Sequence, residues 1–121
     1  MAEPHRVTSA EYPYIPVRLE IRGQQFEQYA LLDTGFTGEL AIPATLLATT
    51  IDVPDEHADW ELADGSIIDA PIYLGTLEIL GLPPILSVAV TTLGNEFILG
   101  RGILDLCVVA FERGERVIIE A

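Results

Sequence analysis

The chain has 121 residues and a formal net charge of −13, from 19 acidic side chains against 6 basic ones. This length suits one domain, and half of the residues are hydrophobic, which is enough for a packed core. Such a negative charge argues against nucleic-acid and anionic-membrane partners, because affinity for phosphate groups needs basic side chains.

The apolar residues do not predict a membrane anchor or an export signal. No stretch reaches the roughly 18 to 20 uninterrupted apolar residues that span a bilayer. The first six residues, MAEPHR, lack the apolar segment of a signal peptide. The single cysteine, Cys107, lies in the apolar run LCVVAF and is expected to be a buried, inert thiol. We therefore expect a soluble, cytoplasmic protein.

The first half of the chain predicts an arm followed by paired strands. Residues 1–13 are polar and proline-containing, which favours a flexible N-terminal arm before a single domain at 14–121. Strict alternation of apolar and charged residues over 15–22 predicts a half-buried strand. A glycine turn and a second strand over 25–32 follow.

The second half of the chain predicts many short strands and one short helix. A helical turn is expected after Pro43, and Asp64-Gly65 predicts a hairpin between arms at 60–62 and 66–68. Further strands are expected at 72–80, 85–91, 107–112 and 116–120, with a helix at 102–106. Short strands separated by glycine and proline indicate an all-β fold, a small closed β-barrel with one short C-terminal helix.

The stretch ALLDTG places a carboxylate directly after a buried strand. A charge in that position is costly unless it is paired, solvated or used in chemistry. Asp33 is held by the strand, Thr34 offers hydrogen bonds that fix the loop, and Gly35 leaves room for a substrate backbone. Taken alone, the tripeptide favours an ordinary Asx turn after a strand over a catalytic loop.

The surrounding residues resemble the retropepsin-like (clan AA) aspartic proteases, of the cellular or bacterial type. The stretch PVRLEIRGQQFEQYALLDTG resembles the opening of these enzymes. FILGRGILDL, downstream, resembles their second hallmark, an apolar run followed by Gly-Arg and a helix. WELADGSII occupies the place of the hairpin called the flap. The resemblance covers about residues 16–120 and implies a retropepsin-like barrel.

The resemblance implies an aspartic endopeptidase that hydrolyses peptide bonds with an activated water. That reaction needs two carboxylates which share one proton, because like charges so close cannot both ionise. The chain contains one Asp-Thr-Gly and no Asp-Ser-Gly. A dyad therefore requires a homodimer in which Asp33 from each subunit meets on a two-fold axis.

The resemblance also implies roles for individual residues, with a peptide or protein as substrate and no metal or cofactor. Asp33 would be catalytic, and Thr34 and Gly35 would form the active-site loop and lock the dimer. Substrate-binding residues would be Gly35, Phe36 and Thr37 in that loop, with Ala63, Asp64, Gly65 and Ser66 at the flap tip. Gly100 and Arg101 would support the loop from behind.

Two departures from the family pattern leave alternatives open. Phe36 replaces the usual alanine or serine, so its ring either narrows the cleft or forms a pocket wall. Thr37 and Gly38 replace two acids of the viral enzymes, so Arg101 needs another partner, and the nearest acid is Glu39. A catalytically inactive peptide-binding or scaffold module with this fold is the alternative function. A monomeric barrel whose Asp33 only caps a turn is a further one.

Several other polar features have both a structural and a functional interpretation. Residues 52–69 hold seven acids and no base, and form either a solvated surface or the acidic entrance of a cleft. His5 and His57 lack the spacing of metal ligands and are expected at the surface. Trp60 either packs in the core or shapes the base of the flap. The alternating run 116–120 predicts an edge strand at the subunit interface.

Overall fold

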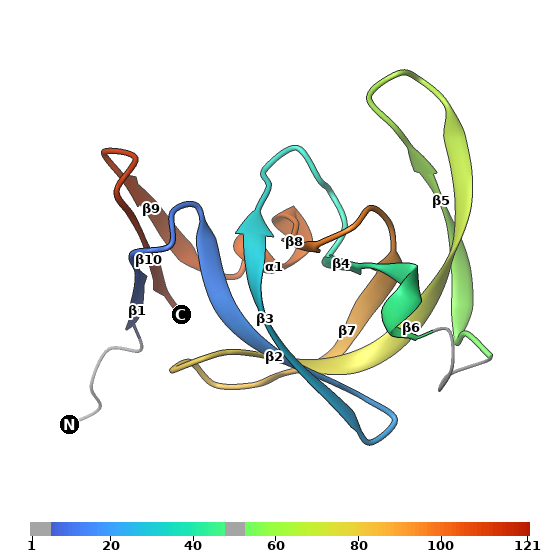
Figure 1. Cartoon of the computed structure of the whole chain (residues 1–121), viewed down its shortest axis with the longest axis horizontal. Coiled ribbons are helices and arrows are strands. Elements are labelled where there is room, and N and C mark those ends of the chain that lie inside the picture. Colours follow the sequence, from blue (N-terminus) through green and yellow to red (C-terminus); the bar gives the residue numbers. More distant parts are fainter. Residues whose placement is uncertain (1–5, 48–52) are drawn as a thin grey trace.

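The computed structural model describes residues 6–47 and 53–121, which form a mostly β molecule (Figure 1). The strands are β1 (Arg6–Ser9), β2 (Tyr14–Ile21), β3 (Gln24–Leu32), β4 (Leu40–Ile42), β5 (Glu56–Glu61), β6 (Ile67–Ile79), β7 (Ile85–Thr92), β8 (Phe97–Leu99), β9 (Val108–Glu112) and β10 (Arg116–Glu120). A 3-10 turn (Ala44–Leu46) follows β4, and helix α1 (Arg101–Leu104) follows β8. Within the described ranges, no helix has the length and apolar character needed to cross a membrane.

Six of the strands close into a barrel, as the sequence predicted. Their order is β2-β3-β8-β4-β7-β6, and antiparallel pairing of β2 with β6 completes the ring. The seventh strand of this sheet, β5, pairs only with β6 and forms a hairpin that rises above the barrel at the upper right of Figure 1. The all-β barrel, the short C-terminal helix and the hairpin are therefore confirmed.

The order of three central strands positions the loop that carries Asp33. β3 and β4 are consecutive in the chain, yet β8 lies between them, parallel to β3 and antiparallel to β4. The loop at 33–39 must therefore cross the end of β8 to reach β4. Leu32 and Leu99 are register partners, so Asp33 and Gly100 leave their parallel strands at the same end of the sheet.

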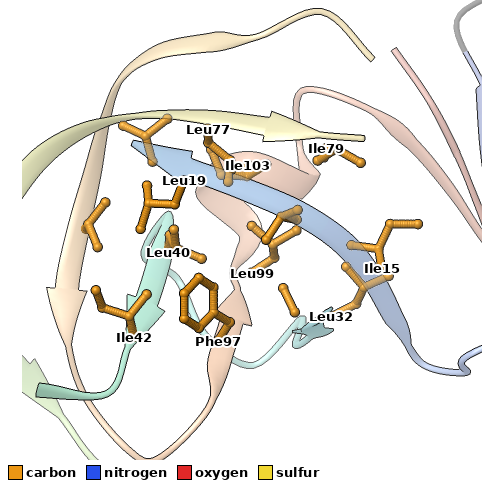
Figure 2. Packing of buried hydrophobic residues seen from close by; sticks show 14 of the residues in the cluster. Ile15, Leu19, Leu32, Leu40, Ile42, Leu77, Ile79, Phe97, Leu99 and Ile103 are labelled. Atoms are coloured by element: carbon orange, nitrogen blue, oxygen red, sulfur yellow. The ribbon is translucent and has the colours of Figure 1, made fainter. Parts of the chain in front are cut away.

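The core fills the inside of the barrel (Figure 2). The alternation predicted for the first strand holds, because the even positions of β2 carry the polar side chains and the odd positions are 0% exposed. Figure 2 shows the packed side chains Ile15, Leu19, Leu32, Leu40, Ile42, Leu77, Ile79, Phe97, Leu99 and Ile103. Ile103 comes from α1, so the helix packs on the barrel core. The same core includes Leu32, the residue before Asp33.

A second sheet of three strands has the order β1-β10-β9. Residues 6–9, which fall in the expected flexible arm, form β1 and pair with β10. The prediction that residues 116–120 form an edge strand is wrong, because β10 is paired on both sides, with β1 and with β9. The alternation reflects instead a strand with one face on the core, where Val117 and Ile119 are fully buried.

Two further differences concern strand limits. The sequence separated a flap arm from a strand over 72–80, whereas β6 runs without interruption from Ile67 to Ile79. β4 was not predicted, because three buried apolar residues between two loops show no periodicity that marks a strand. The helical turn expected after Pro43 is present as the 3-10 turn.

Candidate active site

Asp33 lies immediately after β3, half-buried, at the end of the sheet where α1 begins. Its backbone N–H donates a hydrogen bond to the Leu99 carbonyl oxygen, at 3.0 Å. Its Oδ1 accepts a hydrogen bond from the Gly35 N–H at 2.8 Å. The side chain is thus oriented by the loop that it belongs to, while part of the carboxylate stays open to solvent.

The residues after β8 hold the Asp33 loop by backbone hydrogen bonds. The Arg101 N–H donates to the Phe36 carbonyl at 2.8 Å, and the Gly102 N–H donates to the Gly38 carbonyl at 2.9 Å. The Gly100 N–H donates to the Glu39 carbonyl at 3.0 Å. Gly100 and Arg101 therefore contact the loop from behind through main-chain atoms, at the positions expected for supporting residues.

A side chain would clash at two glycines of the site, with the backbone at Gly100 and with aromatic side chains at Gly38. A Cβ atom on Gly100 would lie 2.6 Å from Cδ2 of Phe36 and 2.7 Å from the Phe36 carbonyl oxygen. A Cβ atom on Gly38 would lie 2.7 Å from Cη2 of Trp60. The φ of Gly100 is −99°, which any residue adopts, so close packing alone excludes a side chain there.

Phe36 packs against the base of the flap hairpin. Its ring centroid lies 5.2 Å from that of Trp60 on β5, with an angle of 53° between the planes. The Trp60 Nε1–H donates to Thr91 Oγ1 at 3.1 Å, and the Thr91 hydroxyl donates to the Pro71 carbonyl at 3.2 Å. Phe36 therefore connects the Asp33 loop to β5, β6 and β7, and its ring forms a wall at the base of the β5–β6 hairpin.

The flap tip folds as the hairpin that the sequence predicted. The Leu62 N–H donates to the Ser66 carbonyl at 2.8 Å, and Gly65 has a φ of 86°, which favours glycine. Oδ1 of Asp64 accepts hydrogen bonds from the Ser66 N–H at 2.9 Å and from the Ser66 hydroxyl at 2.6 Å. These bonds lower the pKa of Asp64, first through the hydroxyl and then through the N–H. Ala63, Asp64, Gly65 and Ser66 are all exposed.

Glu39 does not pair with Arg101. Its Oε1 accepts a hydrogen bond from the Ala89 N–H in β7, at 2.8 Å, so this carboxylate joins the loop to the barrel wall. Within residues 6–47 and 53–121, Arg101 forms no ion pair, and its side chain is exposed. The place of the missing viral-type acids is taken by main-chain bonds from Arg101 and by the Glu39–Ala89 bond.

The acidic segment is divided between structural and exposed carboxylates. Asp55 accepts a hydrogen bond from the Leu74 N–H at 2.8 Å and pairs with Arg22 at 3.3 Å. Nδ1 of His57 lies 3.0 Å from Oδ1 of Asp69, with both side chains exposed, so His57 lies at the surface as predicted. His5 and Asp52 lie outside the described residues. In the part of the chain that is described, no three His, Cys, Asp or Glu side chains gather as metal ligands.

Some contributors to the site escaped sequence reasoning. Thr91 is a nearly fully buried polar residue that orients Trp60, and Glu39 was recognised only as the nearest acid to Arg101. A signal for the Phe36–Trp60 contact was present, because an unusually large residue followed the Asp-Thr-Gly and a tryptophan lay near the flap. Thr34 and Thr37 are exposed on the loop, at its solvent side.

One chain supplies half of the machinery that the sequence predicted. The loop, its supports and the flap base are brought together, and among the described residues the Asp33 carboxylate accepts a hydrogen bond from the Gly35 N–H. A site of this kind can hold a water molecule beside one carboxylate, but a shared proton needs a further acid.

Comparison with solved structures agrees with this architecture. A retropepsin-like aspartic protease from Rickettsia conorii superposes with a TM-score of 0.65 and 10% sequence identity, covering 98% of this chain and 92% of that one. At 10% sequence identity, the superposition shows only that the two chains share a fold. No protein-family profile and no curated protein sequence matches the chain. The chain therefore has a retropepsin-like fold.

Proposed function

We propose that the protein is an aspartic endopeptidase whose dyad consists of Asp33 from each of two identical subunits. The proposal is supported by the fold, which resembles that of an aspartic protease, and by the place of Asp33 at the end of β3. The observation on which it chiefly depends is the braced loop, in which three consecutive N–H groups at 100–102 bond the carbonyls of Phe36, Gly38 and Glu39. Such bracing holds a carboxylate in a fixed geometry, which catalysis requires.

The proposed reaction is hydrolysis by a water held between the two carboxylates. The ionised Asp33 takes a proton from the water, and the protonated Asp33 of the partner subunit donates a hydrogen bond to the scissile carbonyl oxygen. The water oxygen attacks the carbonyl carbon while Asp33 of the partner subunit gives its proton to the carbonyl oxygen, which yields a tetrahedral diol. Asp33 then passes the proton that it took from water to the amide nitrogen, and one diol hydroxyl returns its proton to the partner's Asp33. The C–N bond breaks, and an amine and a carboxylic acid leave.

The flap provides the second element of the proposal. Its exposed tip, from Ala63 to Ser66, would close over a bound peptide and exclude water. At the base of the flap, the rings of Phe36 and Trp60 pack with their centroids 5.2 Å apart. This contact holds the flap base against the catalytic loop. Phe36, which packs on Trp60, and the exposed Thr37 would contact substrate side chains.

A digest of a peptide library at acidic pH tests the proposal. Wild-type protein is expected to cleave peptides internally, whereas Asp33→Asn abolishes cleavage, because asparagine cannot accept the proton from water. Asp69→Asn is the matched control, since it makes the same change of carboxylate to amide on β6, where Asp69 is exposed and pairs with His57. Cleavage that persists in Asp33→Asn contradicts the proposal.

The same experiment addresses the alternative of an inactive scaffold. If neither wild-type protein nor variants cleave any library member, while the wild-type protein still binds peptides, the chain is a peptide-binding module with this fold. Peptides that the protein retains from the library are labelled with a fluorophore. Their binding is then measured by fluorescence anisotropy.

A further inference from the structure

We propose that a cavity beside the Asp33 loop binds the side chain of a lysine or arginine of the substrate, with Glu96 as its counter-ion. This inference rests on the proposed function, because it names the class of peptide that the same site takes. It also assigns Tyr14 as the positioning residue of Glu96.

The cavity lies beside the end of β3 that leads to Asp33. Its volume is about 310 Å³, and its walls include residues of β2, of β3 and of the segment that enters β8. Tyr14, at the start of β2, pairs in register with Leu31, two residues before Asp33. Two strand residues span about 7 Å, so the cavity is within reach of side chains near the scissile bond of a peptide held at Asp33.

Strand alternation places the cavity and Asp33 on the same side of β3. Ala30 and Leu32 are buried in the barrel core, so Tyr29 and Leu31 belong to the outer face, and Tyr29 is 48% exposed. The bond from the Asp33 N–H to the Leu99 carbonyl continues the β3–β8 ladder. Alternation therefore extends to Asp33, which shares the face of the cavity wall.

The polar groups of the cavity suit one positive charge on an apolar stem. Its walls carry two phenol rings, two amide side chains and one carboxylate, from Tyr14, Tyr29, Gln28, Asn95 and Glu96, and none of its described lining residues is basic. Tyrosine rings attract cations at their faces, and amide oxygens accept hydrogen bonds from ammonium and guanidinium groups. An anion would meet the Glu96 charge, and an alkyl side chain would desolvate it without a partner.

Tyr14 orients the half-buried Glu96 and leaves one carboxylate oxygen available. The Tyr14 hydroxyl donates a hydrogen bond to Oε1 of Glu96 at 2.9 Å, and this bond raises the pKa of Tyr14, which keeps the phenol protonated as a donor. The described residues give Oε2 no hydrogen-bond donor and give Glu96 no ion pair. Five other carboxylates pair with arginine: Glu27, Asp55, Glu78, Glu112 and Glu120.

The arginines of the chain do not supply the cation for Glu96. Four of the six pair with other carboxylates: Arg6, Arg18, Arg22 and Arg116. Arg101 follows the opposite end of β8 from Glu96, and Arg113 lies in the turn between β9 and β10, in the other sheet. The cation therefore comes from a bound molecule, and a peptide held at Asp33 brings its side chains to this place.

Titration with small cations tests the cavity without any peptide cleavage. Butylammonium and butylguanidinium reproduce the ends of lysine and arginine, and butanol is the uncharged control. Both cations should shift the amide NMR signals of Gln28, Tyr29 and Asn95 saturably, whereas butanol should not.

Two charge variants complete this titration. Glu96→Gln keeps an oxygen acceptor for Tyr14 but removes the charge, and it should weaken binding of both cations at least about tenfold. Glu20→Gln changes the net charge equally at an exposed position of β2 outside the cavity, and it should leave binding unchanged. The inference is overturned if neither cation shifts these signals, or if both bind Glu96→Gln as tightly as they bind the wild-type protein.

Matched peptides test whether the cavity selects the substrate. A cleaved library peptide is resynthesised with lysine, arginine, norleucine or glutamate at each position near the scissile bond. At one position, kcat/KM for the lysine or arginine peptide should exceed that for the norleucine peptide at least about tenfold.

The ratio of these kcat/KM values identifies the residues responsible. It should fall towards one in Glu96→Gln, fall partly in Tyr14→Phe, which leaves the carboxylate without its orienting bond, and stay unchanged in Glu20→Gln. Because both peptides meet the same enzyme sample, a loss of folded protein cancels from the ratio. An unchanged ratio in Glu96→Gln contradicts the inference.

The two experiments separate this inference from the proposed function. Cation binding in the cavity of a chain that cleaves no peptide removes the endopeptidase and leaves the cation site. Cleavage without a preference for lysine or arginine at any position removes this inference and leaves the endopeptidase.

Discussion

The rings of Phe36 and Trp60 lie 5.2 Å apart by their centroids, one on the Asp33 loop and the other on the strand that leads to the flap tip. Tilted aromatic pairs at this distance contribute about 0.5 to 1.5 kcal/mol beyond their buried area. Movement of the flap relative to the loop therefore changes the surroundings of Trp60. The chain contains one tryptophan, so tryptophan fluorescence reports on the surroundings of Trp60 alone.

Phe36→Ala is expected to shift the emission of Trp60 to longer wavelength, because removing the phenyl ring exposes the indole to water. Phe111→Ala removes an equal ring from β9, in the sheet that does not contain Trp60, and should leave the emission unchanged. Fluorescence spectra of both variants in dilute solution provide the measurement. An unchanged spectrum in Phe36→Ala would show that the two rings do not pack in solution.

Gly100→Ala is expected to lower the free energy of unfolding by about 1 to 3 kcal/mol, as overpacking does in a closely packed site. Its Cβ would meet Cδ2 and the carbonyl oxygen of Phe36 at 2.6 and 2.7 Å, so the catalytic loop must move. Peptide cleavage should fall more than the loss of folded protein explains. Urea denaturation and cleavage assays on the same sample measure the two effects.

Gly102→Ala is the control for that prediction. Its Cβ would meet main-chain atoms no closer than 3.0 Å, at the Gly38 carbonyl oxygen, whereas a Cβ on Gly100 would lie 2.7 Å from the Phe36 carbonyl oxygen. Alanine is also preferred to glycine within a helix by about 0.5 to 1 kcal/mol. The variant should therefore be less destabilised than Gly100→Ala, and an equal loss in both would contradict the steric explanation.

The sequence predicted those features that depend on local patterns. Alternation located β2, and the Asp64-Gly65 pair located the flap turn, whereas the three-residue strand β8 was not predicted. It could not show that β8 lies between β3 and β4, since that order is a property of pairing between distant segments.

The misassigned edge of β10 has the same origin. Alternation reveals that one face of a strand is buried, but it contains no information about how many neighbours the strand has. β1 supplies the second neighbour of β10 from the opposite end of the chain, out of a segment whose composition suggested a loose arm. The Phe36–Trp60 contact likewise joins residues that are 24 positions apart, which local periodicity cannot report.

Glu39→Ala is expected to destabilise the fold by about 1 to 3 kcal/mol, because the partly buried Ala89 N–H loses its acceptor at 2.8 Å. Glu39→Gln retains an oxygen acceptor and should remain close to wild type. Urea denaturation of the two variants measures the difference. If Glu39 acted instead through a charge pair with Arg101, the glutamine variant would lose as much stability as the alanine variant.

Asp55 gives a prediction for the pH dependence of stability. The Leu74 N–H, followed by the smaller contribution of Arg22, lowers the pKa of Asp55 below its ordinary value of 3.8. A carboxylate whose folded pKa is lowered stabilises the fold above its unfolded pKa, and this contribution is lost as the pH falls through the folded value. The free energy of unfolding should therefore decrease on acidification less in Asp55→Asn than in the wild-type protein.

Asp59→Asn provides the comparison, since it removes one charge from the exposed face of β5 and among the described residues its carboxylate accepts no hydrogen bond. Urea denaturation from about pH 7 to about pH 2.5 should then give a shallower acid limb for Asp55→Asn than for Asp59→Asn. Because the two substitutions change the net charge equally, general charge repulsion cancels between them. Identical acid limbs would mean that the Leu74 and Arg22 contacts do not favour the ionised form of Asp55, and that β5 is not tied to β6 through this carboxylate.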